Sequence, residues 1–188
     1  LAAASAETKT KHFLIIGPWD HAGTRTPTDE AAGIKFGGAA VIDLNDLHRQ
    51  WYDWTMKSGP KPEFLKDRVA YYLLAPGNTG ANGEWKYADD FDKLTANRHP
   101  LYLDASGSGG NGVFHSGALS EKPASPGADE YIYDPLDTHR GEDVDNVDNE
   151  KTAGIDQRRT LSIAKDGLVY HSDPVTRETA LIGCPKLT

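Results

Sequence analysis

The sequence lacks several features that define large classes of protein. It contains one cysteine, Cys184, among 188 residues, which excludes a disulfide within the chain. No apolar run approaches the roughly eighteen residues that a membrane-spanning helix needs. The small apolar stretch at residues 2–6 has no basic residues before it and is too short for the core of a signal peptide. A single cysteine does not establish a cytosolic protein, so the compartment stays open.

Positive charge is also scarce. The chain has 20 Lys and Arg against 28 Asp and Glu, a formal net charge of -8. Proteins that bind nucleic acid present a basic surface to the phosphates, so this composition argues against a nucleic-acid partner. An anionic membrane surface would repel the chain for the same reason. The hydrophobic share of 38% is low but sufficient for a globular core.

The strongest functional signal lies at residues 13–21, FLIIGPWDH. The four apolar residues 13–16 predict a short strand that is buried on both faces, and Gly17 and Pro18 end it. The loop after a parallel strand can present a side chain to a ligand, and an imidazole exchanges a proton near neutral pH. His21 is therefore a candidate general base. The alternative is a loop histidine that only bonds backbone, because no nucleophile lies nearby in the sequence.

Residues 14–21 resemble the histidine motif of the CocE/NonD acyl hydrolases. This group includes cocaine esterase-like enzymes, α-amino-acid ester hydrolases, glutaryl-cephalosporin acylases and the X-Pro dipeptidyl-peptidases of the S15 type. Further segments similar to this family follow in the family's order and cover nearly the whole chain: residues 47–54, 68–74, 83–85, 100–103, 131–135, 156–157 and 167–170.

The resemblance implies the C-terminal end of an α/β-hydrolase catalytic domain at residues 1–66. The N-terminal part of a jelly-roll β-sandwich, galactose-binding-like in outline, would follow at residues 67–188. It also implies a Ser-His-Asp triad, of which only His21 can be assigned here. The serine of such enzymes lies on a G-x-S-x-G elbow before the acid and the histidine, and this motif is absent. We therefore expect a C-terminal fragment, inactive alone, whose serine and aspartate lie upstream of Leu1.

Asp20, next to His21, is a candidate for the triad acid, but we reject this assignment. Adjacent residues rarely place a carboxylate against the neighbouring imidazole, and the family's acid comes from a separate loop. We expect the His21 ring to face a cavity that upstream polypeptide completes.

A helix is predicted after a long loop at residues 22–40. Asp43 suits the N-cap position, and residues 58–60, Ser-Gly-Pro, provide a stop through a C-terminal glycine and a proline. We expect the apolar face of this helix to pack on the hydrolase sheet and His48 to be a surface or structural residue. Four apolar residues recur at helical spacing: Leu44, Leu47, Trp51 and Trp54.

The sequence changes character near Lys66, where we place a domain boundary. Short β-rich runs separated by turn residues follow, as is typical of an all-β sandwich. We expect Tyr72, Trp85, Tyr102 and Tyr131 to serve a core or a seam between domains. Strands are predicted at residues 69–74, 84–87, 101–104, 131–133, 160–163, 168–170 and 179–182.

Two motifs suggest ligands that we do not expect. Residues 107–112 satisfy G-x-G-x-x-G after a strand, but a dinucleotide site also needs a following helix, and residues 113–117 do not begin one; a flexible hairpin is expected. Residues 142–150 are rich in carboxylates that could hold calcium, but they lack the EF-hand spacing, and a solvated acidic loop is expected.

The sequence thus predicts a serine hydrolase that cleaves acyl ester or amide bonds of a small molecule. Its partners would be this substrate and the remainder of the parent polypeptide, with no cofactor and no metal. Two alternatives stay open: a non-catalytic β-sandwich binding module and an X-Pro dipeptidyl-peptidase. The substrate and the oligomeric state are not determined.

Overall fold

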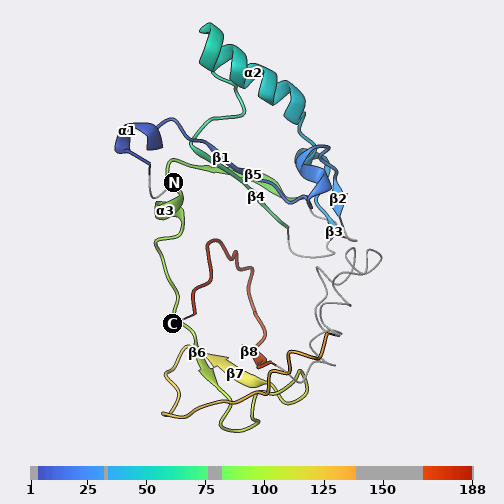
Figure 1. Ribbon diagram of the computed structural model, residues 1–188, viewed down its shortest axis with the longest axis vertical. Helices are drawn as coiled ribbons and strands as arrows, with labels where there is room; N and C mark the ends of the chain where they lie inside the picture. Colours follow the sequence, from blue (N-terminus) through green and yellow to red (C-terminus); the bar gives the residue numbers. More distant parts are fainter. Residues whose placement is uncertain (1–3, 32–33, 76–81, 139–166, 188) are drawn as a thin grey trace. The chain divides into compact units, whose positions relative to one another are not determined.

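The computed structural model describes residues 4–31, 34–75, 82–138 and 167–187 (Figure 1). In these residues a few helices accompany three small β-sheets, so the predicted mixture of α and β structure is confirmed. The chain forms two compact units. The first contains Leu1–Asn97 and Ala180–Thr188, and the second contains Arg98–Thr179.

The first unit is built on a three-stranded sheet with the order β1-β4-β5. Strand β1 (Leu14–Ile16) runs parallel to β4 (Val69–Leu73), and β4 runs antiparallel to β5 (Glu84–Ala88). The boundary that we expect near Lys66 therefore falls inside this unit, because the β1–β4 pairing joins segments from both sides of it. The structure divides the chain between Asn97 and Arg98 instead.

The predicted helix is α2 (Leu44–Lys57). The Asp43 carboxylate caps it by accepting a 2.9 Å hydrogen bond from the Asp46 amide. The helix ends where Ser58, with φ 60°, adopts the left-handed conformation and the Gly59 amide bonds the Asp53 carbonyl. The stop thus uses Ser58, not the glycine, as the left-handed residue. Two single-turn helices, α1 (Ala6–Lys9) and α3 (Phe91–Leu94), complete the unit's α-helices in the described residues.

The segment predicted as a long loop contributes to the core. It contains the 3-10 helices η1 (Ala22–Thr24) and η2 (Gly38–Ala40) and the hairpin strands β2 (Glu30–Ala31) and β3 (Ile34–Lys35). The prediction of a structureless loop was wrong here because these elements are too short to show a period in the sequence. The buried residues Phe36, Ala40 and Tyr72 form one cluster, and partly buried residues pack against it: Ala31, Ile34 and Trp85.

The second unit contains a three-stranded sheet with the order β6-β7-β8. Strand β6 (Tyr102–Asp104) runs antiparallel to β7 (Gly117–Ser120), which runs parallel to β8 (Tyr170–His171). The strand predicted at residues 168–170 is thus present but shifted toward the C-terminus. The strand predicted at residues 160–163 lies outside the described residues.

Two predicted strands are wrong. Among the described residues, neither 131–133 nor 179–182 forms a strand. Tyr131, Ile132 and Tyr133 have high β-propensity, but their side chains are exposed by 54%, 83% and 69%. The turn that follows, in which Asp134 accepts a 2.9 Å bond from the Leu136 amide, ends the segment before any pairing. Propensity alone does not form a strand when no neighbour covers one face.

Candidate functional site

The candidate site is the loop that leaves β1. The parallel pairing with β4 fixes this strand, and the Leu14 amide extends the ladder with a 2.8 Å bond to the Arg68 carbonyl. After Ile16 the chain turns at Gly17. A Cβ atom at Gly17 would lie 2.2 Å from the Trp19 ring, so only glycine allows the chain to fold back over this side chain.

Trp19 attaches the loop to the interior of the first unit. Its indole Nε1 donates a 3.0 Å hydrogen bond to the carbonyl oxygen of Ala40, a residue with no exposed surface. Its ring also packs on Trp85 of β5, with 5.8 Å between the ring centroids. The residue two positions before His21 is therefore held by both a hydrogen bond and a ring contact.

A tight turn holds the other side of the loop. The Asp20 carboxylate accepts a 2.8 Å hydrogen bond from the Gly23 amide, and the Thr24 hydroxyl donates a 2.6 Å bond to the His21 carbonyl. His21 is the residue that precedes η1. Asp20 thus acts within the turn, and its carboxylate satisfies an amide at the start of a helical segment.

The His21 side chain is exposed. His21 does not line either of the two grooves described below. The structure therefore combines a fixed backbone with an exposed imidazole. The Asp20 carboxylate is bonded to the Gly23 amide.

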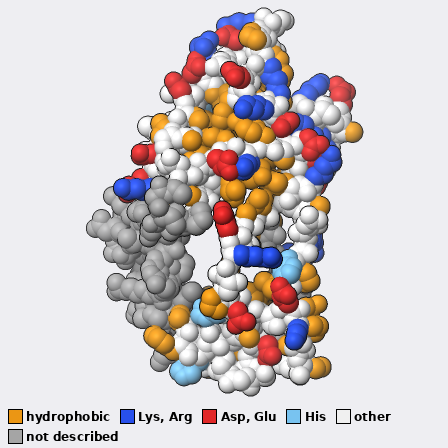
Figure 2. Space-filling model, turned by 180° about the vertical axis from the view of Figure 1, so that it is seen from behind, with side chains coloured by type: hydrophobic (Ala, Val, Ile, Leu, Met, Phe, Trp, Pro, Cys, Tyr) orange, Lys and Arg blue, Asp and Glu red, His pale blue; other side chains and the backbone are white. Residues whose placement is uncertain are grey.

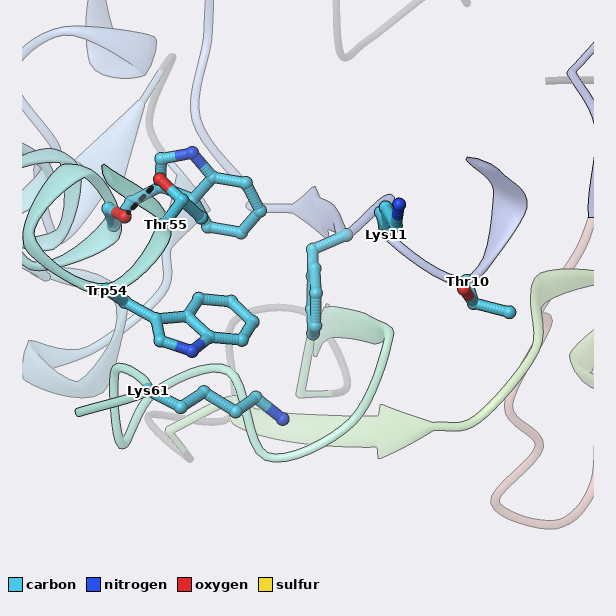
Figure 3. Close-up of a pocket in the computed structure, with 7 residues that line it drawn as sticks. Thr10, Lys11, Trp54, Thr55 and Lys61 are labelled. Carbon is cyan, nitrogen blue, oxygen red and sulfur yellow. Dashed lines mark hydrogen bonds between the residues drawn. The ribbon is translucent and has the colours of Figure 1, made fainter. Parts of the chain in front are cut away.

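The two grooves lie on either side of Phe13, between the N-terminal segment and α2. The first has a volume of about 540 Å³, and Figure 3 shows the Trp54 indole and the Lys61 side chain along it. Its aromatic wall is an edge-to-face trio of Phe13, Trp51 and Trp54, with centroid distances from 5.4 to 5.8 Å. The Lys61 ammonium lies 5.1 Å from the centre of the Phe13 ring.

The second groove has a volume of about 340 Å³ and is lined in part by Leu44, Leu47 and His48. The prediction that α2 has an apolar face is confirmed, since Leu47 is buried and both tryptophans pack on Phe13. This face is only partly covered, and Figure 2 shows hydrophobic side chains gathered at the surface of the upper part of the view. His48 is exposed, as expected.

In the second unit, Tyr170 packs against the glycine-rich connection between β6 and β7. Its hydroxyl donates a 2.5 Å hydrogen bond to the Asp129 carboxylate. Burial, assisted by the hydrogen bond and the charge of Asp129, raises the pKa of Tyr170 to about 12. A Cβ atom at Gly117 would lie 2.5 Å from the Tyr170 ring, which explains why glycine occupies this position.

The glycine-rich motif at residues 107–112 lies in this hairpin connection, and no helix follows it. The expected hairpin is confirmed. The acidic residues 142–150 and the segment 156–157 lie outside the described residues. Where the structure describes the chain, it contains no group of three or more His, Cys, Asp and Glu side chains that could hold a metal ion. No helix of that part has both the length and the apolar character to span a membrane.

Comparisons with known proteins identify no family for this chain. No protein-family model matches this chain, and neither a curated protein nor a solved structure matches it. The resemblance to CocE/NonD acyl hydrolases thus rests on the sequence motifs themselves.

Sequence reasoning did not identify two features of the site. It did not anticipate that Trp19 anchors the loop, although a tryptophan between a proline and an aspartate is an unusual loop residue. It also did not place Phe13 between Trp51 and Trp54. The only sequence signal for that trio is the helical spacing of the two tryptophans, which indicates a face but not its partner.

Proposed function

We propose that this chain supplies the general-base histidine, His21, of a serine hydrolase that cleaves acyl ester or amide bonds. The arrangement of the β1 loop carries the proposal. Hydrogen bonds from Trp19 to Ala40 and from Gly23 to Asp20 hold the backbone of the loop before and after His21. The His21 side chain is exposed to solvent. A general base needs this combination, because its position must be exact and its nitrogen must reach another group.

In this mechanism the serine hydroxyl, supplied by polypeptide before Leu1, attacks the acyl carbonyl and transfers its proton to His21. The protonated imidazole then gives that proton to the leaving alkoxide or amine as the carbon–oxygen or carbon–nitrogen bond breaks. A water molecule, deprotonated by His21, releases the acyl group in the second half of the reaction. An aspartate from the same upstream region would orient the ring.

The proposal also implies the domain to which each part of the fold belongs. Strand β1 and helix α2 would belong to the end of an α/β-hydrolase domain, and the sheet β6-β7-β8 would be part of a jelly roll. The parallel β1–β4 pairing and the packing of Trp51 and Trp54 on Phe13 support a helix beside a sheet that contains parallel strands. Acyl ester hydrolysis is preferred over X-Pro peptidase action because the residues around His21 are closer to the acyl hydrolases.

A specific observation favours a second candidate, a non-catalytic β-sandwich binding module. His21 lines neither groove of the described residues, and an exposed loop histidine is also what a simple connector would show. Fold alone does not distinguish the two functions. The gene upstream of Leu1 does, because the hydrolase requires a G-x-S-x-G elbow there and the module does not.

The experiment that tests the proposal labels the parent protein with a fluorophosphonate, which reacts with an activated serine. We expect one serine upstream of Leu1 to be labelled, and the rate of labelling to fall at least about 100-fold in His21→Ala because the serine loses its base. His48→Ala, the same substitution at an exposed histidine on α2, is the matched control and should label at the wild-type rate. Equal labelling of all three proteins would contradict the proposal.

A further inference from the structure

The position of His21 depends on one short segment, residues 36–40, whose first and last residues are buried. Three aromatic side chains donate hydrogen bonds to backbone carbonyls of residues 36–40. The Tyr72 hydroxyl bonds Phe36 at 2.7 Å, and the indoles of Trp85 and Trp19 bond the adjacent carbonyls of Ala39 and Ala40 at 2.8 and 3.0 Å. Tyr72 and Trp85 come from β4 and β5, so the sheet fixes this segment and Trp19 attaches the β1 loop to it.

The loop is also folded closely around the Trp19 side chain. A Cβ atom at Gly17 would lie 2.2 Å from the six-membered part of the indole, and one at Gly23 would lie 2.4 Å from the Trp19 Cβ. The two glycines flank His21 at distances of four and two residues along the chain. The Trp19 side chain therefore lies closely against the chain both before and after the histidine, through its ring at Gly17 and through its Cβ at Gly23.

Trp19 is held by a hydrogen bond in addition to the packing of its ring. The carbonyl oxygen of Ala40 belongs to a residue with no exposed surface, and it also accepts a 3.1 Å hydrogen bond from the Ile42 amide. The indole N–H is therefore its second donor, and this bond together with the ring contact on Trp85 fixes the depth and the orientation of the indole. A change of that orientation would move the backbone of His21 with it.

We infer that Trp19 is the positioning residue for His21: its indole N–H, bonded to Ala40, holds the loop in the one conformation that presents the imidazole. This inference rests on the proposed function for its catalytic consequence, but the geometric part concerns the loop alone. In this inference the effect of Trp19 on the reaction passes through the placement of His21. A misplacement of about 1 Å in a reacting group can cost on the order of a hundredfold in rate.

The test uses the parent protein with three substitutions. Trp19→Phe removes both the N–H and part of the ring, whereas benzothienylalanine at position 19 keeps the bicyclic shape and removes only the N–H. Trp54→Phe is the matched control, because Trp54 belongs to the separate aromatic trio with Phe13 and Trp51. Two quantities are measured: the kcat and KM for a p-nitrophenyl ester, and the mobility of the His21 ring by NMR of ¹³C-labelled histidine, assigned with His21→Ala.

Both Trp19 variants are expected to lower kcat by about 10- to 100-fold with KM within about twofold of wild type, and to increase the mobility of the His21 ring. Trp54→Phe should leave both quantities unchanged. If Trp19→Phe does not fold, the benzothienylalanine variant carries the test alone. An unchanged ring mobility in that variant would overturn the inference. A fully active His21→Ala would instead contradict the proposed function, and the NMR comparison would still decide whether Trp19 positions the loop.

Discussion

The hydroxyl of Tyr72 donates a 2.7 Å hydrogen bond to the carbonyl oxygen of Phe36, 36 positions earlier in the chain. Both residues are buried, with 8% and 3% of their surface exposed. The bond connects the centre of the sheet to the segment that also holds Trp19. Its strength therefore bears on the stability of the whole first unit.

Tyr72→Phe should lower the free energy of unfolding by about 0.5–1.5 kcal/mol, because the variant loses one of the two hydrogen bonds to the Phe36 carbonyl, and the Gly83 amide at 3.1 Å remains as the other donor. Urea denaturation followed by tryptophan fluorescence measures this change. Tyr52→Phe is the control, since Tyr52 is 57% exposed on α2, and its stability should match the wild type. Equal stability of both variants would show that the Tyr72 hydroxyl contributes nothing.

Asp43→Ala should destabilise α2 by about 1 kcal/mol, since the carboxylate that accepts the Asp46 amide at 2.9 Å is lost. Asp43→Asn keeps an oxygen acceptor and should lose much less. Circular dichroism during thermal unfolding compares the two. If Asn and Ala are equally destabilising, the charge of Asp43 rather than its capping bond stabilises the helix.

Gly117→Ala should destabilise the second unit by about 1–3 kcal/mol because of overpacking. The added methyl group would lie 2.5 Å from the Tyr170 ring and 2.8 Å from the Asp104 carbonyl. Gly107→Ala, in the connection between β6 and β7, places its methyl group where no atom lies within 4 Å. Hydrogen exchange of the β7 amides should therefore accelerate in the first variant and stay unchanged in the second.

The raised pKa of Tyr170 predicts a loss of stability in alkali. The folded protein holds the phenol proton up to a pKa of about 12, whereas an unfolded tyrosine has a pKa of about 10. The stabilisation is therefore complete below about pH 10 and is lost as the pH rises toward about 12. Tyr170→Phe cannot titrate, so the difference in unfolding free energy between wild type and variant should shrink across this range. Parallel pH profiles of the two proteins would contradict the assignment.

The sequence predicts the elements whose signals are local and leaves out what depends on long-range contacts. The strand at β1 and the helix α2 have local signals, an apolar run that ends at Gly17 and an apolar face that begins after Asp43, and both elements are present. The prediction that the strand is buried on both faces was wrong, because β1 is only partly covered and Ile16 is 42% exposed. The strand predicted at residues 131–133 has the same local marks but no partner in the described residues. Pairing depends on a neighbour that no local pattern reveals.

The candidate site also has features with local sequence signals and features that depend on long-range contacts. The sequence points to His21 and to the turn that exposes it. It does not reveal the role of Trp19, because the carbonyl that Trp19 bonds lies 21 positions further along the chain in a segment without periodicity. It also does not reveal that β1 pairs in parallel with β4 across the expected boundary. Both features depend on tertiary contacts between segments that are distant in sequence.

The central claim is that His21 accepts and returns the proton of a serine supplied by the parent polypeptide. Steady-state hydrolysis of a p-nitrophenyl ester by the parent protein tests this claim most directly, with His21→Ala compared with His48→Ala. The account predicts that kcat/KM falls by at least about 1,000-fold in His21→Ala and stays within about twofold in His48→Ala. Activity of His21→Ala within a few-fold of wild type would contradict it.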